Sequence, residues 1–554
     1  MSQDGLHLRL PAVARERSAA VASVILVSRF AAAAMLNYAF GVALAWLLVP
    51  AEFGTVSAIQ NVLMLVAGMV TAGLPWALAR RVAETYDDPE AAKPEFRVAL
   101  ITNSGLGLLL GVAFVGAQLS GLQLVPTHSL ILDLIVAVEM PATAFLNVLA
   151  GAAQGSRRFG GLGAMQGGEI LIKCIAAMFL VTVLHAGPAG VASGYLVGTL
   201  GAILIGFRTV KGLLPGRGPL ANFSFLAASG STWFAWASMA FLITADLLGL
   251  EVIGKAAGVT AAVLAAYQAC SLLARASFYA TDALADAVFP FMTRSKTLME
   301  KHHWFVAAAR WVPLLIIPLQ AGLFLAPVPV LRLFLPGRYA GAEMLLRVLA
   351  AGTLGALTTN MLMKSLFANG YGRQIARRMS ITVVVDVTAL VILVPRHGSL
   401  GAAYAYLIAS FAGVALLLPL YLKALQVRLP GPRRLVTYAA GLVPTATVFA
   451  FADRSPAPLA WALIPAGLCL FLVPARRMRL ITDSDLSVLR ARLPVIAGRE
   501  RAKLIGLRAG RRMYSAPPPD YREPGATVTE SCASQDRLSL HGTRAGSTHR
   551  AEGR

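Results

Sequence analysis

The chain has 554 residues, of which 57% are hydrophobic and 14% charged, and its mean hydropathy is +0.67. This composition excludes a soluble globular protein and predicts a helical protein that crosses a membrane many times. The formal net charge of +22 at pH 7 requires no nucleic-acid partner, because the basic residues follow membrane topology and gather in the two terminal segments.

Fourteen apolar stretches follow one another along the chain, each long enough to cross the hydrocarbon core of a bilayer. They predict an all-α, polytopic membrane protein with about 14 transmembrane helices. The predicted spans are residues 19–49, 55–79, 98–121, 129–152, 161–185, 187–207, 222–250, 257–290, 304–327, 344–369, 375–395, 398–424, 434–452 and 456–475.

Basic residues are distributed unevenly over the loops between these spans. If the N-terminus is cytoplasmic, the cytoplasmic loops carry roughly four times as many Arg and Lys residues as the opposite loops. The few basic residues of the opposite loops are Lys255, Arg332, Arg338, Arg396 and Arg454. This bias predicts an even number of spans with both termini in the cytoplasm.

The two ends of the chain are basic and polar. Residues 1–18 are predicted to form a cytoplasmic N-terminal segment, and residues 476–554 a cytoplasmic tail that is disordered from about residue 515. Basic segments beside a membrane attract anionic lipid headgroups, at about 1 kcal/mol per residue. Membrane lipids are therefore the predicted partners of both termini, and binding of a protein by the tail is the alternative.

An internal repeat suggests that the bundle is duplicated. Residues 187–198 read GPAGVASGYLVG and residues 398–409 read GSLGAAYAYLIA, at a constant offset of 211 positions. Duplicated bundles with the substrate path between the halves are typical of alternating-access transporters, whereas the alternative is a chance likeness between Ala/Gly-rich helices. The predicted organisation is a first lobe of six helices (19–218), a second lobe of six (219–425) and two extra helices (426–475).

Enzyme motifs are missing from the sequence. Residues 249–255 match the phosphate-loop spacing G-x-x-x-x-G-K, but Ala256 stands where that loop needs Ser or Thr, and no strand is predicted before it. The zinc-protease and serine-hydrolase motifs are lacking, and the four cysteines do not have metal-ligand spacing. We therefore predict no enzyme activity, no metal and no cofactor.

The ionisable residues inside the predicted spans are the candidate site. Each costs about 2.5 to 3.5 kcal/mol at the centre of a membrane, so they are expected to face the bundle interior or water. The cations, assigned to substrate binding, are Arg29, Lys173, Arg275 and Lys364, and the acids, assigned to ion coupling or pairing, are Glu139, Glu169, Asp246, Asp282, Asp286 and Asp386.

Two spacings organise these residues. At about 100° per residue, Arg275, Asp282 and Asp286 lie within roughly 40° of one another and form one polar stripe. Glu169 and Lys173 are four residues apart and can pair on one helix face. The functional interpretation is a path that holds an anionic substrate while carboxylates exchange a proton or sodium ion; the structural interpretation is internal ion pairing. Lys364 lies near a cytoplasmic end, from which its side chain can reach water.

Several segments, in order, resemble bacterial polysaccharide flippases. Residues 47–84 resemble the opening helical pair of that family, with a Pro-acidic-aromatic-Gly turn and a Gly-Leu-Pro/basic-Val-Ala-Glu ending. Further similar segments are AGAAQGSRRFG at 150–160, TADLLG around Asp246, VFPFMTRS at the end of the eighth span, LPGRYAGAEMLLRVLA at 335–350 and GSLGAAYAYLIAS at 398–410.

This resemblance implies membership of the multidrug/oligosaccharidyl-lipid/polysaccharide exporter superfamily, with two six-helix lobes around a cavity. It implies a lipid-linked sugar as substrate, carried across the bacterial plasma membrane. Arg29 matches a basic residue of the family's first helix, and Asp246 matches an acidic position in the seventh. Leu247 follows Asp246 where the family often has a basic residue, so a salt bridge of Asp246 is left in question.

The functional hypothesis is a flippase or exporter of lipid-linked oligosaccharide or polysaccharide precursors that works by alternating access and is driven by an ion gradient. Three alternatives stay open, namely a multidrug extruder of the same fold, a flippase for the cell-wall precursor lipid, and a non-transporting scaffold for polysaccharide synthesis. Polysaccharide-synthesis enzymes are expected as partners in addition to the substrate and the membrane.

Overall fold

The computed structural model describes residues 35–477, except for residues 72, 86–87, 123, 128, 157, 215–223, 255–256, 295–315 and 426–431. The described residues form helices and connecting turns and contain no β-strand, which confirms the predicted all-α polytopic fold. Arg29, the segment 1–18 and almost all of the predicted tail lie outside the described residues.

Helices of the described residues overlap the predicted spans, although residues 19–34 and 304–315 of the first and ninth spans lie outside the described residues. Within the described residues, eight helices are long and apolar enough to cross a membrane, and the number rises to ten if two sharply bent pairs each count as one span. α14 (Gly372–Leu425) covers the predicted spans 375–395 and 398–424, which meet at Gly398 with a φ of 56° and a ψ of −128°. A positive φ is strained for residues with a Cβ, so glycine permits the turn between these two spans.

The first half of the chain begins with the helix Met35–Leu47 and continues through α2 (Pro50–Thr71), α3 (Leu74–Glu84) and α4 (Lys93–Leu119). It ends with α5 (Leu130–Gly155), α6 (Phe159–Thr182) and α7 (Gly187–Val210). α7 lies close against α6, because a Cβ on Gly198 would stand 2.8 Å from the carbonyl oxygen of Glu169 and 2.8 Å from Cβ of Lys173. Small residues at such positions let membrane helices approach closely.

The second half contains two broken spans. α8 (Ser224–Leu242) and α9 (Ala245–Gly254) meet at 58°, and the helix Ile316–Leu325 meets α12 (Pro327–Phe334) at 97°. Between them runs α10 (Ala261–Arg294), and α13 (Glu343–Ala368) packs against both α10 and α14. A break in a membrane helix frees backbone groups, which must find other partners inside the protein.

The two halves meet along α2, which contacts both α8 and α10. Near the middle of this seam the side-chain amide of Asn61 donates to Oε1 of Gln268 over 3.2 Å, and both residues are buried. Toward one end of the seam, a Cβ on Gly54 would come within 2.8 Å of the carbonyl oxygen of Ala261. Near the other end of α2, a Cβ on Gly68 would clash with Cβ of Ala240 in α8, so the halves touch at close range along the length of α2.

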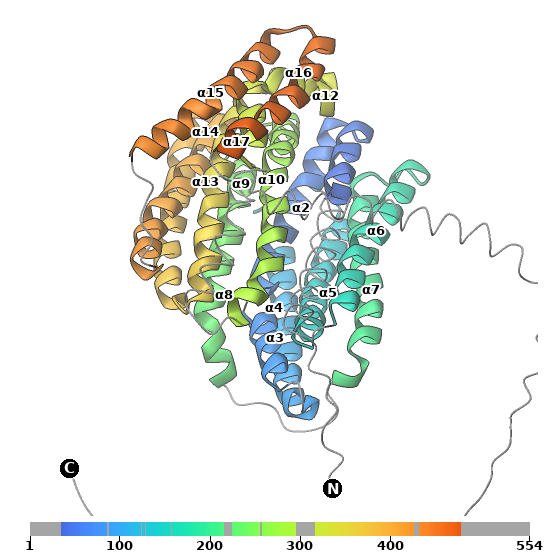
Figure 1. Ribbon diagram of the computed structural model, residues 1–554. Coiled ribbons are helices and arrows are strands. Elements are labelled where there is room, and N and C mark those ends of the chain that lie inside the picture. The colour runs from blue at the N-terminus through green and yellow to red at the C-terminus, as the bar shows by residue number, and fades with distance from the viewer. Residues whose placement is uncertain are drawn as a thin grey trace, which may run out of the picture. The chain divides into compact units, whose positions relative to one another are not determined.

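The last helices pack on the second broken span. These are α15 (Pro432–Arg454), α16 (Ala457–Leu470) and the short α17 (Leu472–Arg477), and they lie at the same end of the bundle as α12 (Figure 1). Phe449 of α15 is fully buried against Gly322 and Gly467. Asp453 accepts a hydrogen bond from the backbone N–H of Val328 and pairs with Arg347 at 2.9 Å, so a carboxylate stabilises the first turn of α12.

Candidate functional site

The first break in the second half places an acidic residue at the start of a half-helix. Asp246 lies in the first turn of α9, two residues after the bend at 243–244, and is fully buried. Its Oδ1 accepts a hydrogen bond from the backbone N–H of Leu247 over 2.8 Å. The free N–H groups of a helix N-terminus favour a carboxylate, so the bend itself stabilises the charge.

The other oxygen of this carboxylate binds two groups of α10. Oδ2 of Asp246 accepts a hydrogen bond from the hydroxyl of Tyr267 over 2.6 Å and forms an ion pair with the guanidinium of Arg275. Asp246 therefore has a basic partner, which comes from α10 instead of from the position that follows it in sequence. Buried ion pairs are retained where each charge is also hydrogen-bonded, as here.

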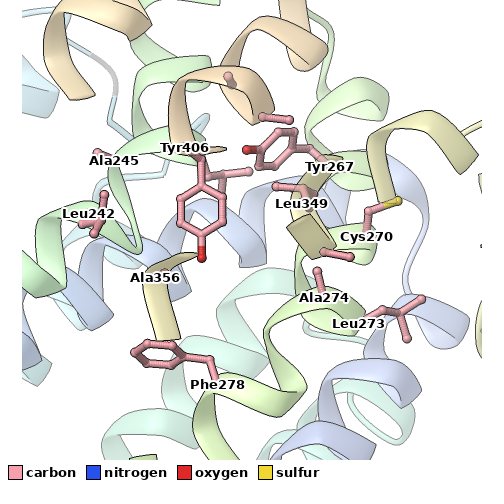
Figure 2. Close-up of a cluster of buried hydrophobic side chains, with 14 of the residues drawn as sticks. Leu242, Ala245, Tyr267, Cys270, Leu273, Ala274, Phe278, Leu349, Ala356 and Tyr406 are labelled. Carbon is pink, nitrogen blue, oxygen red and sulfur yellow. The ribbon is translucent and has the colours of Figure 1, made fainter. Parts of the chain in front are cut away.

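Two tyrosines enclose the ion pair. The guanidinium of Arg275 lies 4.7 Å from the ring centroid of Tyr406, a residue of the repeated segment on α14. Figure 2 shows the rings of Tyr267 and Tyr406 in one buried cluster with side chains of α10 and α13. A cation over an aromatic face gains electrostatic energy where water is excluded.

Asp386 of α14 lies near this ion pair. It is 1% exposed, and neither of its carboxylate oxygens has a hydrogen-bond partner among the described residues. It interacts electrostatically with both Asp246 and Arg275. Buried polar groups are almost always paired in proteins, so a carboxylate without a described hydrogen-bond partner beside an ion pair is a candidate for binding a proton or a small cation.

The first half has its own polar cluster around Lys173 on α6. The ammonium group of Lys173 lies 2.5 Å from Oδ1 of Asn37 and faces the rings of Tyr195 and Phe40, with centroids 4.9 Å and 5.8 Å away. The side chain is 8% exposed. The cation is therefore held between helix 35–47, α6 and α7.

Glu139 on α5 is the acid of this first cluster. Its Oε1 accepts hydrogen bonds from Thr199 over 2.6 Å and from Thr143 over 3.0 Å. Its Oε2 is buried and has no hydrogen-bond partner within the described part of the chain. Glu139 is thus oriented by two hydroxyl groups and keeps one oxygen for another ligand.

Glu169 and Lys173 interact electrostatically across one turn of α6, as their spacing of four residues suggests, but they do not form a close ion pair. Glu169 is half-buried, and no ion pair joins it to Lys173, whose ammonium group binds Asn37 instead. Gly198 of α7 packs against the turn of α6 between these two residues. The spacing of four residues placed them on one face, but a neighbouring helix supplied the partner.

Lys364 differs from the prediction as well. It is 5% exposed, and its ammonium group lies 5.3 Å from the ring centroid of Trp236, so it does not extend to water. Asp282 and Asp286 lie on α10, but their side chains are outside the described residues, as is all of Arg29, so the polar stripe stays a prediction. Among the described site residues, Arg275, Asp246 and Asp386 come together in the second half, and Lys173 and Glu139 lie in the first.

Sequence reasoning missed the uncharged members of both clusters. Asn37, Tyr195 and Thr199 bind or face charges in the first half, and Tyr267 and Tyr406 do so in the second. One signal was present, because Tyr195 and Tyr406 are equivalent positions of the internal repeat. In the structure each of these two tyrosines faces the cation of its own half.

No family model and no curated protein matches the chain in sequence. Solved structures of transporters do match its fold. An inward-facing multidrug resistance MATE family transporter of the MOP superfamily matches with a TM-score of 0.58 and 14% identity, over 71% of this chain and 95% of that one. An outward-facing conformation of such a transporter matches with a TM-score of 0.53 and 16% identity, over 72% and 96%.

A third match is a MOP superfamily transporter from Pyrococcus furiosus Vc1, for which a reverse polarity of the binding pocket suggests a different function. Its TM-score is 0.54 at 15% identity, over 73% of this chain and 96% of that one. At these identities the comparisons establish the fold, which is that of MATE transporters. The described residues contain no cluster of His, Cys, Asp or Glu that could hold a metal ion.

Proposed function

We propose that the protein is a transporter of the bacterial plasma membrane that moves lipid-linked oligosaccharides or polysaccharide precursors by alternating access, with both termini in the cytoplasm. The observation that supports this proposal most is the pair of buried charged clusters, one in each half of a MATE-type fold, each with a cation facing a tyrosine of the internal repeat. Ionisable groups inside a membrane protein are costly and generally mark a substrate or ion path.

The second-half cluster supports ion coupling. Within the described residues, the buried carboxylate of Asp386 has no hydrogen-bond partner, and it lies next to the Asp246–Arg275 pair. A proton or sodium ion bound by Asp386 would cancel its repulsion of Asp246 and its attraction for Arg275, and so change the packing of α9, α10 and α14. Binding energy at this point can shift the balance between two arrangements of the bundle.

The cations support an anionic substrate. Lys173 and Arg275 lie in the two halves, and we assign them, with Arg29 and Lys364, to recognition of the pyrophosphate that links a sugar to its lipid. Arg275 is held by Asp246 in the structure, so it can contact a substrate only after this pair loosens. Movement of α9 at its bend would release it.

Multidrug extrusion is the second candidate, favoured by the fold match to a multidrug resistance transporter. Such a protein would expel amphiphilic cations, which an acidic, aromatic-lined path favours and a buried lysine disfavours. The fold match to a transporter whose reversed pocket polarity suggests a different function is consistent with a substrate other than an amphiphilic cation. A flippase for the cell-wall precursor lipid would use the same charges and differs only in the sugar.

The test is transport by the purified protein in proteoliposomes. A fluorescent lipid-linked oligosaccharide in the inner leaflet should reach the outer leaflet faster than in empty vesicles, and an amphiphilic dye cation should not be moved. Movement of the dye alone would favour the multidrug extruder. A protein without transport that captures polysaccharide-synthesis enzymes would be a scaffold, and removing residues 515–554 should abolish that capture.

A further inference from the structure

A segment of the second half is fastened to the end of a helix in the first half. Arg338, in the short 3₁₀ turn η4 (Gly337–Tyr339), donates through Nη2 to the carbonyl oxygen of Ala45 and, over 2.6 Å, to that of Leu48. These carbonyls belong to the C-terminal end of helix 35–47, where the last carbonyls have no partner within the helix. A cation there also complements the helix dipole.

Aromatic and polar contacts surround this arginine. The indole N–H of Trp46 donates to the carbonyl oxygen of Phe334 over 2.9 Å, and the ring of Tyr38 meets that of Phe334 edge-on at 6.4 Å. The ring of Tyr339 lies 6.3 Å from that of Phe53, and both residues are 3% exposed. All these contacts join the first half to residues 334–339 of the second half, at one end of the bundle.

The predicted topology places this end outside the cytoplasm, because Arg332 and Arg338 belong to the opposite loops. Alternating access requires contacts between the two halves that close the outer end while the inner end is open, and that break when the bundle opens outward. The contacts around Arg338 therefore lie where an alternating-access protein needs a gate.

We infer that Arg338 closes an outer gate. It holds the two halves together at this end, and its hydrogen bonds to the carbonyl oxygens of Ala45 and Leu48 must break before the bundle opens outward. Arg338 is itself exposed, so water can replace both carbonyls when the gate opens. Ala45 and Leu48 are buried while the gate is closed, so their carbonyls gain water as new partners only when the same movement uncovers them. The inference rests on the proposed function only in that it expects the halves to move.

The experiment follows the reactivity of a cysteine placed under the gate. Leu48 is 3% exposed, so Leu48→Cys, with Cys174, Cys270, Cys469 and Cys532 changed to alanine, reports opening through labelling by a membrane-impermeant maleimide added from outside. Arg338→Met removes the donors but keeps most of the side-chain length. Labelling should rise about three- to tenfold, the effect of losing hydrogen bonds from a charged group at a partly exposed site.

Arg332→Met is the matched control, because Arg332 is an exposed arginine of the neighbouring α12, six positions earlier, and it should leave labelling unchanged. Trp46→Phe removes one hydrogen bond and keeps an aromatic ring on an exposed position, and it should raise labelling in the same direction but less. If Arg338→Met does not fold, as judged by gel filtration and melting temperature, Trp46→Phe decides the question.

Labelling of the folded Arg338→Met protein at the parent rate would overturn the inference, and so would an equal increase with Arg332→Met. The measurement needs no substrate. A rise in labelling together with no transport of lipid-linked oligosaccharide would therefore support the gate role of Arg338 and contradict only the proposed substrate.

Discussion

At the scale of single residues, the ion pair between Asp246 and Arg275 joins a bent span to its neighbour. Both side chains are almost fully buried, at 0% and 6% exposure. Loss of one partner from a buried pair leaves an uncompensated charge, which typically costs about 3–5 kcal/mol. The pair thus makes the position of α9 depend on the charge state of its neighbours.

We expect Arg275→Met to lower the melting temperature of the detergent-solubilised protein markedly, because Asp246 is left charged and buried. Asp246→Asn combined with Arg275→Met should recover part of this loss, since no charge is then orphaned. Thermal unfolding of the two single variants and the double variant checks this as a double-mutant cycle. Purely additive effects of the two substitutions would contradict the assigned coupling.

Asp386 should behave in the opposite way. Its carboxylate is buried without a described hydrogen-bond partner, so Asp386→Asn is expected to keep or raise the melting temperature while transport loses its response to an imposed ion gradient. The matched control is Asp133→Asn, because Asp133 is also buried but accepts hydrogen bonds from Gln118 and Thr127. Gradient-driven transport that persists in Asp386→Asn would remove this residue from the coupling site.

At the scale of elements, the bundle depends on close helix contacts and on bends at defined positions. α6 and α7 approach each other at Gly198, and α14 turns at Gly398 with its positive φ. The bends at 243–244 and 326 expose helix ends inside the protein, and Asp246 and Asp453 each bind a backbone N–H near such an end. Acidic residues thus accompany both breaks.

Gly198→Ala should destabilise the protein by about 1–3 kcal/mol, the usual range for overpacking, since the new Cβ would stand 2.8 Å from two atoms of α6. Gly167→Ala is the control, because a Cβ at that position meets no atom within 4 Å. Melting temperatures of both variants in the same detergent test the difference. Equal melting temperatures would show that α6 and α7 can separate freely at this point.

The spans were predictable because apolar stretches of sufficient length have few alternatives to a membrane helix. The predicted spans 375–395 and 398–424, for example, correspond to the two parts of α14 on either side of Gly398. The bend between α8 and α9 was not predicted, because the residues around 243–244 are as apolar as the helices they join and contain no proline.

Partners of the charged residues were harder to predict than their positions. The sequence shows that Glu169 and Lys173 share a helix face. It cannot show that the ammonium group of Lys173 donates a hydrogen bond to Asn37, 136 positions earlier. Asp246 has no basic residue next to it in sequence, and it forms an ion pair with Arg275, which lies 29 residues later. Tertiary packing between different helices decided both pairings.

At the scale of the whole molecule, the two halves form a seam along α2, and each half holds its own cluster of charges. The Asn61–Gln268 hydrogen bond lies on this seam. The basic tail is not part of the described bundle. Both charged clusters lie before residue 410, so a transporter is expected to work without residues 515–554, whereas a scaffold that recruits enzymes through the tail is not.

Removal of residues 515–554 tests this difference. We expect the shortened protein to transport at the rate of the full chain in proteoliposomes of neutral lipid, because both charged clusters are retained. The comparison is made at equal protein content per vesicle. A complete loss of transport on truncation, with the protein still folded, would assign the tail a direct role in movement of the substrate.

We propose that buried charges in the two halves of one bundle move an anionic lipid-linked sugar with the help of an ion gradient. The most direct measurement is the initial rate at which a fluorescent lipid-linked oligosaccharide changes leaflet in proteoliposomes, with a proton or sodium gradient imposed and then collapsed. The account predicts a rate that falls when the gradient is collapsed and that no longer responds to it in Asp386→Asn. A wild-type rate equal to that of empty vesicles under every gradient would contradict it.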